Sequence, residues 1–166
     1  MTEIFTIGYE GADLGAFLRR LQAEGISTLI DVRELPLSRR RGFSKNQLAA
    51  HLGAHGIQYR HSRELGAPRK IRHELRETGD YRHYFRQFNA YLHTQGTALE
   101  CLIEECGGAV VLMCFERDPT ECHRSAVARE LGKLADLEPV HLDVEGHRGP
   151  VSKAEGVRPR QGSAAG

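Results

Sequence analysis

The segment Ala109-Val-Val-Leu-Met113 decides the fold class of this 166-residue chain. It is an uninterrupted apolar run that follows Gly107-Gly108, and a short run of this kind is typical of a buried strand in a parallel sheet. Just beyond it, Asp118-Pro-Thr-Glu121 places a capping residue, a proline and a glutamate in the order that starts a helix. We therefore expect a strand, a turn and a helix in succession, which is the repeating unit of α/β proteins.

Strand and helix patterns alternate along the rest of the chain. The expected strands are Ile4–Gly8, Ser27–Val32, Ile57–His61, Val110–Cys114 and Pro139–Leu142. The expected helices follow Asp13 and a capping box at Ser44–Gln47, cover Tyr81–His93 and Thr97–Cys106, and run from Asp118 to about Ala135. The stretch that contains Gly66 and Pro68 reads as a long polar connection.

This alternation predicts a single α/β domain over residues 1–144, with a mostly parallel sheet and helices on both faces. The arrangement is Rossmann-like and three-layered, with the strands Ile4–Gly8, Ser27–Val32 and Val110–Cys114 inside the sheet. Residues 145–166 are rich in Gly, Arg and Ser. They predict a mobile tail, because so few apolar residues cannot offset the entropy lost on ordering.

The composition indicates a soluble, cytoplasmic protein. Hydrophobic residues make up 40% of the chain and charged residues 27%, which is ordinary for a globular domain. No apolar run is long enough to span a membrane, so no membrane partner is expected. The first residues, Met-Thr-Glu-Ile-Phe-Thr, do not resemble a secretory signal, and the four cysteines are therefore expected to be reduced thiols.

A net charge of +1 conceals two basic segments. Arg33–Lys45 holds five basic residues against one acid, and Arg60–Arg76 holds six against two. Either segment taken separately could be a solvated loop. Together they indicate one positive face that attracts phosphates or other polyanions, such as a phosphate-bearing small molecule or a nucleic acid.

Most of the unusual side chains directly follow a predicted strand. Because parallel strands end at the same edge of a sheet, these side chains are expected to share the edge where open α/β sheets bind ligands. The residues are Tyr9, Glu10, Asp31, Arg33, His61, Arg63, Cys114, Glu116, Cys122, His123 and Arg124.

The motifs of this chain also resemble those of an uncharacterised bacterial and archaeal family, "domain of unknown function 488". The resemblance rests on Thr6-Ile-Gly-Tyr-Glu-Gly11, Asp31-Val-Arg33 with Pro36 and Ser38, Phe43-Ser44, Leu65-Gly66 and the block Cys114…Cys122-His123-Arg124. It spans about Ile4 to Leu142. It implies a single α/β domain and a site at these motifs, with no established activity.

Four of the residues at this edge are candidates for catalysis. Asp31 and Glu116 can act as an acid–base pair, or they can form ion pairs that fix the loops. Cys122 beside His123 at a helix start would have its thiolate favoured, as reactive cysteines require. The alternative is that Cys122 is a small buried side chain that fills space. A helical His123 would point about 100° away from Cys122.

Four others are candidates for substrate binding. Arg33 and Arg124 could form a fork that holds a phosphate, in which case each matters more to binding than to folding. Tyr9 could stack on a base or cover the sheet edge, and His61 lies at the same edge.

Two function classes and one metal hypothesis follow from these residues. Cys114, Cys122 and His123 offer three zinc ligands, with His61 or Glu116 as a fourth. Seven residues separate the two cysteines, against about two to four in common zinc motifs, so the sequence predicts no metal site and identifies no cofactor.

The first function class is an enzyme that acts on a nucleotide or nucleic-acid-related substrate, and the second is a non-catalytic nucleic-acid-binding module. A closed cleft around Asp31, Glu116 and Cys122 would favour the enzyme. A flat positive face with exposed Tyr9, Phe43 and Tyr81 would favour the binding module.

Overall fold

A computed structural model describes residues 1–144 of the chain and shows the predicted parallel sheet. The five strands are β1 (Glu3–Gly8), β2 (Thr28–Asp31), β3 (Gln58–His61), β4 (Ala109–Cys114) and β5 (Val140–Leu142). All pairs are parallel and their order is β3-β2-β4-β1-β5. The three strands expected inside the sheet, β1, β2 and β4, each have a neighbour on both sides.

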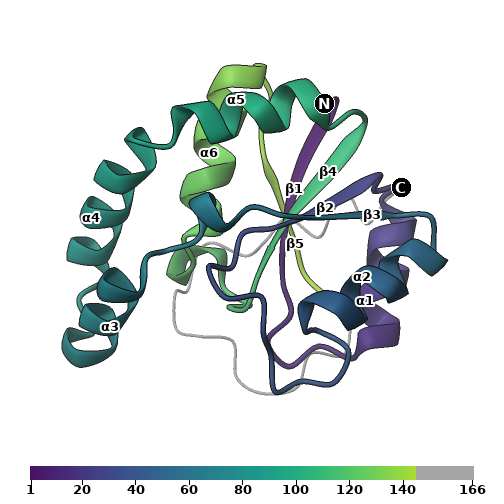
Figure 1. The fold of residues 1–166 in the computed structure, drawn as a ribbon, viewed down its shortest axis with the longest axis horizontal. Helices are drawn as coiled ribbons and strands as arrows, with labels where there is room; N and C mark the ends of the chain where they lie inside the picture. The colour runs from purple at the N-terminus through teal and green to yellow at the C-terminus, as the bar shows by residue number, and fades with distance from the viewer. Residues whose placement is uncertain (145–166) are drawn as a thin grey trace.

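Helices cover both faces of the sheet (Figure 1). They are α1 (Leu14–Ala23), α2 (Lys45–Ala54), α3 (Arg69–Thr78), α4 (Tyr81–His93), α5 (Gly96–Glu105) and α6 (Arg124–Ala135). Apolar side chains of α1 and α2 form one core, and those of α4, α5 and α6 form another. Val110 and Leu112 of β4 point into the second core, whereas Val111 and Met113 point into the first. The predicted three-layer α/β arrangement is thereby confirmed.

The end of β1 makes a very close contact with the loop that follows β4. A Cβ atom at Gly8 would lie 1.9 Å from the carbonyl oxygen of Glu116. Only a residue without a side chain allows this approach. It brings Glu116 directly over the carboxyl end of the sheet.

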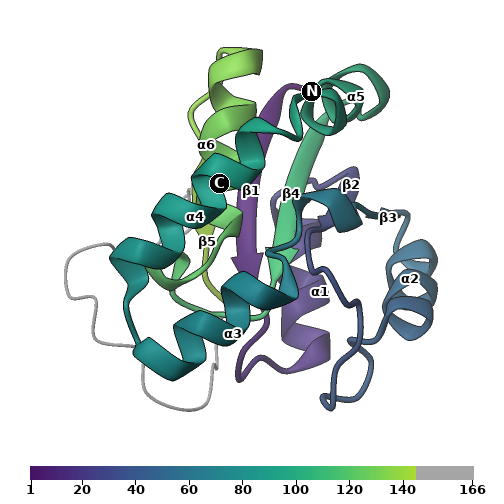
Figure 2. The ribbon, with the colours of Figure 1, turned by 60° about the vertical axis from the view of Figure 1, so that its left-hand side comes forward.

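The expected polar connection after His61 is wrong, because it contains a helix. A short 3-10 turn, Arg63–Leu65, is followed by α3 (Arg69–Thr78) and by Gly79, whose left-handed φ of 66° ends the helix. No residue of α3 is fully buried, and only Ile71 and Leu75 pack against the core. Only two of its ten residues are apolar, so its amphipathic pattern is carried by few hydrophobic side chains among many charged ones. Figure 2 shows that α3 lies at the end of the sheet toward which the strand arrows point.

One predicted helix start is displaced in the structure, and one predicted capping bond is missing. Asp118 caps a 3-10 turn, Pro119–Glu121, by accepting a hydrogen bond from the Thr120 amide, and the α-helix itself begins only at Arg124. Ser44 precedes α2 but makes no capping bond. Its hydroxyl instead bonds the backbone of Ser38 and closes the arginine-rich loop.

The predicted mobile tail, residues 145–166, lies outside the described residues. Within residues 1–144, no helix combines the length and the apolar character that crossing a bilayer requires.

Candidate functional site

A buried ion pair lies at the end of β2. Both carboxylate oxygens of Asp31 accept hydrogen bonds from the Arg33 guanidinium, at 2.8 Å from Nε and 2.7 Å from Nη2. The Tyr59 hydroxyl donates to Asp31 Oδ2 at 2.5 Å. Burial alone disfavours the charge of Arg33, but hydrogen bonding to Asp31 outweighs it and raises the pKa of the guanidinium. Asp31 and Arg33 are 0% and 6% exposed, so this ion pair is buried inside the protein.

Tyr9 belongs to the wall of the site. Its ring stacks on Phe43 at a centroid distance of 4.6 Å, and the Arg33 guanidinium lies 5.3 Å from the ring centroid. Arg33 Nη1 also donates to the Tyr9 hydroxyl at 3.1 Å. Tyr9 is only 2% exposed, and it offers no open ring face for a base.

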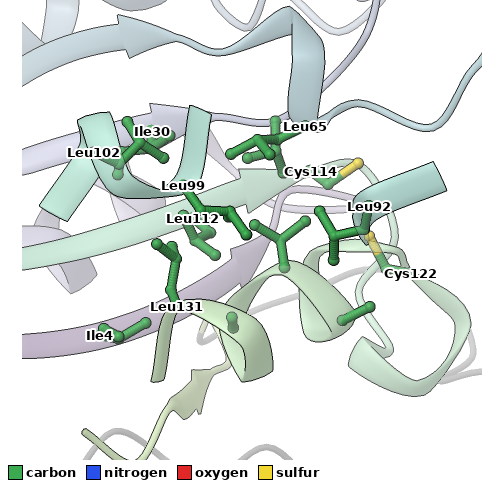
Figure 3. Close-up of a cluster of buried hydrophobic side chains, with 14 of the residues drawn as sticks. Ile4, Ile30, Leu65, Leu92, Leu99, Leu102, Leu112, Cys114, Cys122 and Leu131 are labelled. Atoms are coloured by element: carbon green, nitrogen blue, oxygen red, sulfur yellow. The ribbon is translucent and has the colours of Figure 1, made fainter. Parts of the chain in front are cut away.

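Two cysteines and a histidine meet beside this wall. His123 Nδ1 lies 3.8 Å from the sulfur of Cys114 and 3.9 Å from that of Cys122. Figure 3 shows both sulfur atoms at the same end of the buried cluster. Cys122 has an extended backbone and His123 a helical one, which turns both side chains to the same place. The expectation that a helical His123 points away from Cys122 is therefore wrong.

The backbone holds the imidazole of His123 from the other side. His123 Nε2 lies 2.6 Å from the carbonyl oxygen of Val32, and the ring packs edge-on against Phe88. None of the four cysteines of the chain is in a disulfide.

The pKa values of the ionisable groups in this cluster shift in different directions. Burial would raise the pKa of the Cys122 thiol, but a hydrogen bond from Cys114 and the nearby Arg124 and His123 lower it below its usual range. The hydrogen bond with Cys122, together with burial, raises the pKa of Cys114. Burial and the neighbouring Cys122 raise the pKa of Glu116 to about 8. The buried Oε2 of Glu116 has no hydrogen-bond partner among the described residues.

Arg124 does not face the cavity that Arg33 lines, contrary to the geometry expected of a phosphate fork. It is fully buried, and its guanidinium donates to the Thr6 hydroxyl at 3.2 Å, to the Arg117 carbonyl at 3.2 Å and to the Glu116 carbonyl. Every donor group of Arg124 is thus used inside the protein. Arg124 fixes the loop after β4, and Arg33 is held separately by Asp31.

The predicted edge residues border a cavity of about 980 Å³ only in part. Six of the eleven line it, namely Tyr9, Glu10, Arg33, Cys114, Glu116 and His123. The other five do not, namely Asp31, His61, Arg63, Cys122 and Arg124. His61 Nε2 instead lies 2.7 Å from the carbonyl oxygen of Arg33 and supports the loop from outside.

Sequence reasoning missed two parts of the site. One is Tyr59, whose hydroxyl reaches Asp31 from β3. The other is α3, which contributes Arg72, Leu75 and Arg76 to the cavity. Arg72 and Arg76 stand four residues apart and therefore share a helix face, a signal that the sequence did contain.

Five arginines and three glutamates are among the residues that line the cavity, and the exposed arginines form its mouth. The arginines that line it are Arg33, Arg39, Arg40, Arg72 and Arg76. Three of them have partners on the protein: Arg33 pairs with Asp31, Arg72 with Glu34 at 2.7 Å, and Arg40 donates to the Ala12 carbonyl. Arg39 and Arg76 are exposed and form no ion pair within residues 1–144. They face the same cavity from the loop after β2 and from α3.

The half-buried His141 contacts Thr6, which also binds Arg124, and gives a testable pH dependence. His141 Nδ1 lies 2.6 Å from the Thr6 hydroxyl, and burial together with the charge of Arg124 lowers the pKa of His141 from 6.5 to about 4. The unfolded chain therefore binds a proton near pH 6.5 that the folded chain binds only near pH 4. The stability that His141 contributes should be fully present above pH 6.5 and should be lost as the pH falls toward 4. The loss amounts to up to about 3 kcal/mol.

Urea unfolding of the wild type and His141→Gln at pH 7 and pH 4.5 measures this contribution. The variant should lose less stability between the two pH values than the wild type. His51→Gln, a change at an exposed histidine of α2, should behave like the wild type. Equal losses in all three proteins would contradict the assignment.

Comparison with known proteins identifies the family. The family model "Domain of unknown function DUF488" matches residues 13–131, so the chain belongs to this family. A search of curated proteins and a search of solved structures gave no significant match.

Proposed function

Since the chain belongs to a family without an assigned function, we propose from its site that it is an enzyme acting on a phosphate-bearing, nucleotide-like substrate. The observation that carries this proposal is one cavity with arginines at its mouth and Cys114, Glu116 and His123 in its wall. Binding groups and reactive groups thus face the same space, at the sheet edge where α/β proteins bind ligands.

The unpaired arginines favour an anionic ligand. A guanidinium with no carboxylate partner donates well-oriented hydrogen bonds to phosphate oxygens. Arg39 and Arg76 are in this state, and they approach the cavity from two different elements. A phosphate between them would neutralise charges that the described residues leave uncompensated.

The size and the apolar lining favour a ligand larger than phosphate. A volume of about 980 Å³ is at the upper end of the range for small-molecule sites. Leu75, Tyr84 and Phe115 also line the cavity, and Phe115 is 42% exposed. Phe115 therefore offers the ring that Tyr9 does not, and a base or a similar flat group can pack on it.

The reactive groups differ in how directly they reach the ligand. Glu116 and His123 line the cavity and can contact a substrate, as can the thiol of Cys114. Asp31 acts through Arg33, and Cys122 acts through its contact with His123. We therefore assign Glu116 and His123 to catalysis and Asp31 to positioning.

The alternative, a nucleic-acid-binding module, fits the aromatic residues less well. Of the three rings expected on a flat face, Tyr9 and Phe43 are 2% and 1% exposed, and only Tyr81 is accessible, at 38%. Stacking on single strands needs several accessible rings in a row. The exposed Arg39–Arg41 loop remains suited to contact with a polyanion.

Arg76→Gln tests the proposal. We expect this variant to bind a nucleotide about ten to a hundred times more weakly, because it lacks one charged hydrogen-bonding group. Its melting temperature should change little, since Arg76 is exposed. A thermal-shift screen of nucleoside mono-, di- and triphosphates selects the probe, and titration calorimetry measures its affinity.

The matched control is Arg19→Gln, which removes an exposed arginine of α1 outside the cavity. It should bind the nucleotide as the wild type does. Equal affinity in both variants, or no stabilisation by any nucleotide, would refute the proposal. Salt-dependent binding of a single-stranded oligonucleotide in the absence of nucleotide binding would favour the alternative.

A further inference from the structure

We propose that Cys114, Cys122 and His123 form a zinc site whose fourth position opens toward the cavity. The three ligand atoms come from the end of β4 and from the bend before α6. This inference rests on the geometry of the cluster and does not depend on the anionic ligand proposed above.

The distances fit a tetrahedral zinc ion. The ligand atoms of the three residues all lie within 4.8 Å of one another, and the two nitrogen–sulfur distances are 3.8 and 3.9 Å. Tetrahedral zinc with bonds of about 2.3 Å to sulfur and about 2.0 Å to nitrogen separates these atoms by roughly 3.6 Å. The nitrogen–sulfur distances need to shorten by only a few tenths of an ångström to complete the site, and the two sulfur atoms have to approach each other by about 1 Å at most.

The hydrogen bond on the far side of His123 independently points to a metal ligand. The carbonyl oxygen of Val32 can only accept, so the Nε2 that lies 2.6 Å from it carries the hydrogen. In the neutral ring Nδ1 then presents its lone pair, and Nδ1 is the atom that faces both sulfurs. Histidines that bind metals are oriented in this way by a backbone carbonyl or a carboxylate.

The burial of these residues also suits a metal ion bound to two thiolates. Cys114, Cys122 and His123 are 6%, 0% and 4% exposed, and Arg124 adds a positive charge close to Cys122. Two thiolates bound to a divalent cation are neutral as a group, which suits a buried position. The long separation of the two cysteines along the chain is no obstacle, because the 3-10 turn Pro119–Glu121 folds the chain back toward the end of β4.

The fourth position gives the site a catalytic character. Cys114 and His123 border the cavity, so a ligand can approach the cluster from that side. Glu116 lines the same wall, and its buried Oε2 has no partner among residues 1–144. Three protein ligands with one open position are typical of catalytic zinc, whereas structural zinc has four. We assign the open position to water or substrate, beside the carboxyl group of Glu116 in the same wall.

Cobalt binding to the full chain tests the site. The reduced protein is titrated with Co²⁺, followed by absorption, and Zn²⁺ is then added to displace it. We expect one Co²⁺ per chain, with the near-ultraviolet charge-transfer band of cobalt–thiolate bonds. Cys122→Ser and Cys114→Ser should weaken Co²⁺ binding by more than the tenfold to hundredfold that loss of an outer partner costs.

The control is Cys101→Ser, which changes a half-buried cysteine of α5. It should bind Co²⁺ as the wild type does. If the wild type binds no stoichiometric Co²⁺ or Zn²⁺, or if Cys101→Ser weakens binding as much as Cys122→Ser, the site does not exist. The wild-type titration decides the matter even if a cysteine variant fails to fold.

Two further measurements distinguish a zinc site from a redox-active cysteine pair and from the anion-binding mouth of the cavity. A disulfide between Cys114 and Cys122 in protein isolated without reductant, with no zinc present, would identify a redox pair and overturn the metal site. Nucleotide affinity of the metal-free protein tests the arginine-lined mouth by itself. The proposed function and the zinc site can therefore fail separately.

Discussion

Asp31→Ala should destabilise the fold by about 3–5 kcal/mol, because it leaves a buried guanidinium without its counter-ion. Arg33 is 6% exposed and gives three of its hydrogen bonds to Asp31, from Nε, Nη2 and its own backbone amide. Water cannot replace these acceptors without opening the wall formed by Tyr9. The Tyr59 hydroxyl loses its acceptor in the same change. Denaturant unfolding measures the loss.

Two companion variants show whether the loss comes from the stranded charge. The double variant Asp31→Leu/Arg33→Met removes both charges and should recover most of the stability, as apolar replacement of buried ion pairs often does. Glu130→Ala removes the partner of the exposed Lys133 and should cost less than about 1 kcal/mol. A loss below about 1 kcal/mol in Asp31→Ala would mean that Arg33 does not depend on this carboxylate.

The inner part of the sheet could be predicted from the sequence because β1, β2 and β4 are buried on both faces. Ala109–Met113 is apolar at every position, and in the structure this strand lies between β2 and β1 with helices on either side. Such a strand has no polar side to confuse its assignment. The edge strands were also found, although Val140–Leu142 is only three residues long.

The helix α3 could not be predicted in the same way. It covers the cavity rather than the sheet, and its exposed positions carry Arg, Lys, His and Glu. Its low hydrophobic content, with Ile71 and Leu75 as the only apolar residues, resembles that of a charged loop, although the apolar and charged side chains fall on different faces of the helix. The arginines that close the cavity were therefore seen as a basic segment, but not as one wall of a site.

The position of the candidate site follows from topology, but the contacts among its residues do not. Parallel strands determine that Tyr9, Arg33 and Cys114 share an edge, and they do. Which donor meets which acceptor depends on rotamers and on local turns. The extended backbone of Cys122 before α6 brings its thiol to His123, and no spacing rule for helices contains that geometry.

Arg124 is the clearest case in which the sequence did not reveal the contacts of a side chain. Replacing Arg124 should have the second large effect that we expect. Arg124→Met should destabilise the fold by about 3–5 kcal/mol, because the Glu116 and Arg117 carbonyls and the Thr6 hydroxyl lose a buried donor. For a chain of this length, that corresponds to a fall in melting temperature of roughly 6–20 °C. The sequence had indicated a small effect on stability and a large one on phosphate binding.

Two controls make the result specific to the buried guanidinium. Arg129→Met changes an exposed arginine on the same helix and should stay within about 0.5 kcal/mol of the wild type. Arg124→Lys keeps the charge, but its single ammonium cannot reach three acceptors that a planar guanidinium serves, so it should restore only part of the stability.

Ligand binding then decides between a structural and a binding role for Arg124. At a temperature where Arg124→Met is still folded, its affinity for the nucleotide found in the screen should fall far less than that of Arg76→Gln. The reason is that Arg124 has no exposed surface and does not line the cavity. An unchanged melting temperature with lost nucleotide binding would instead mean that the loop after β4 opens to present Arg124 to the ligand. Arg124 would then contact the phosphate directly, and the arginines at the cavity mouth would provide additional contacts.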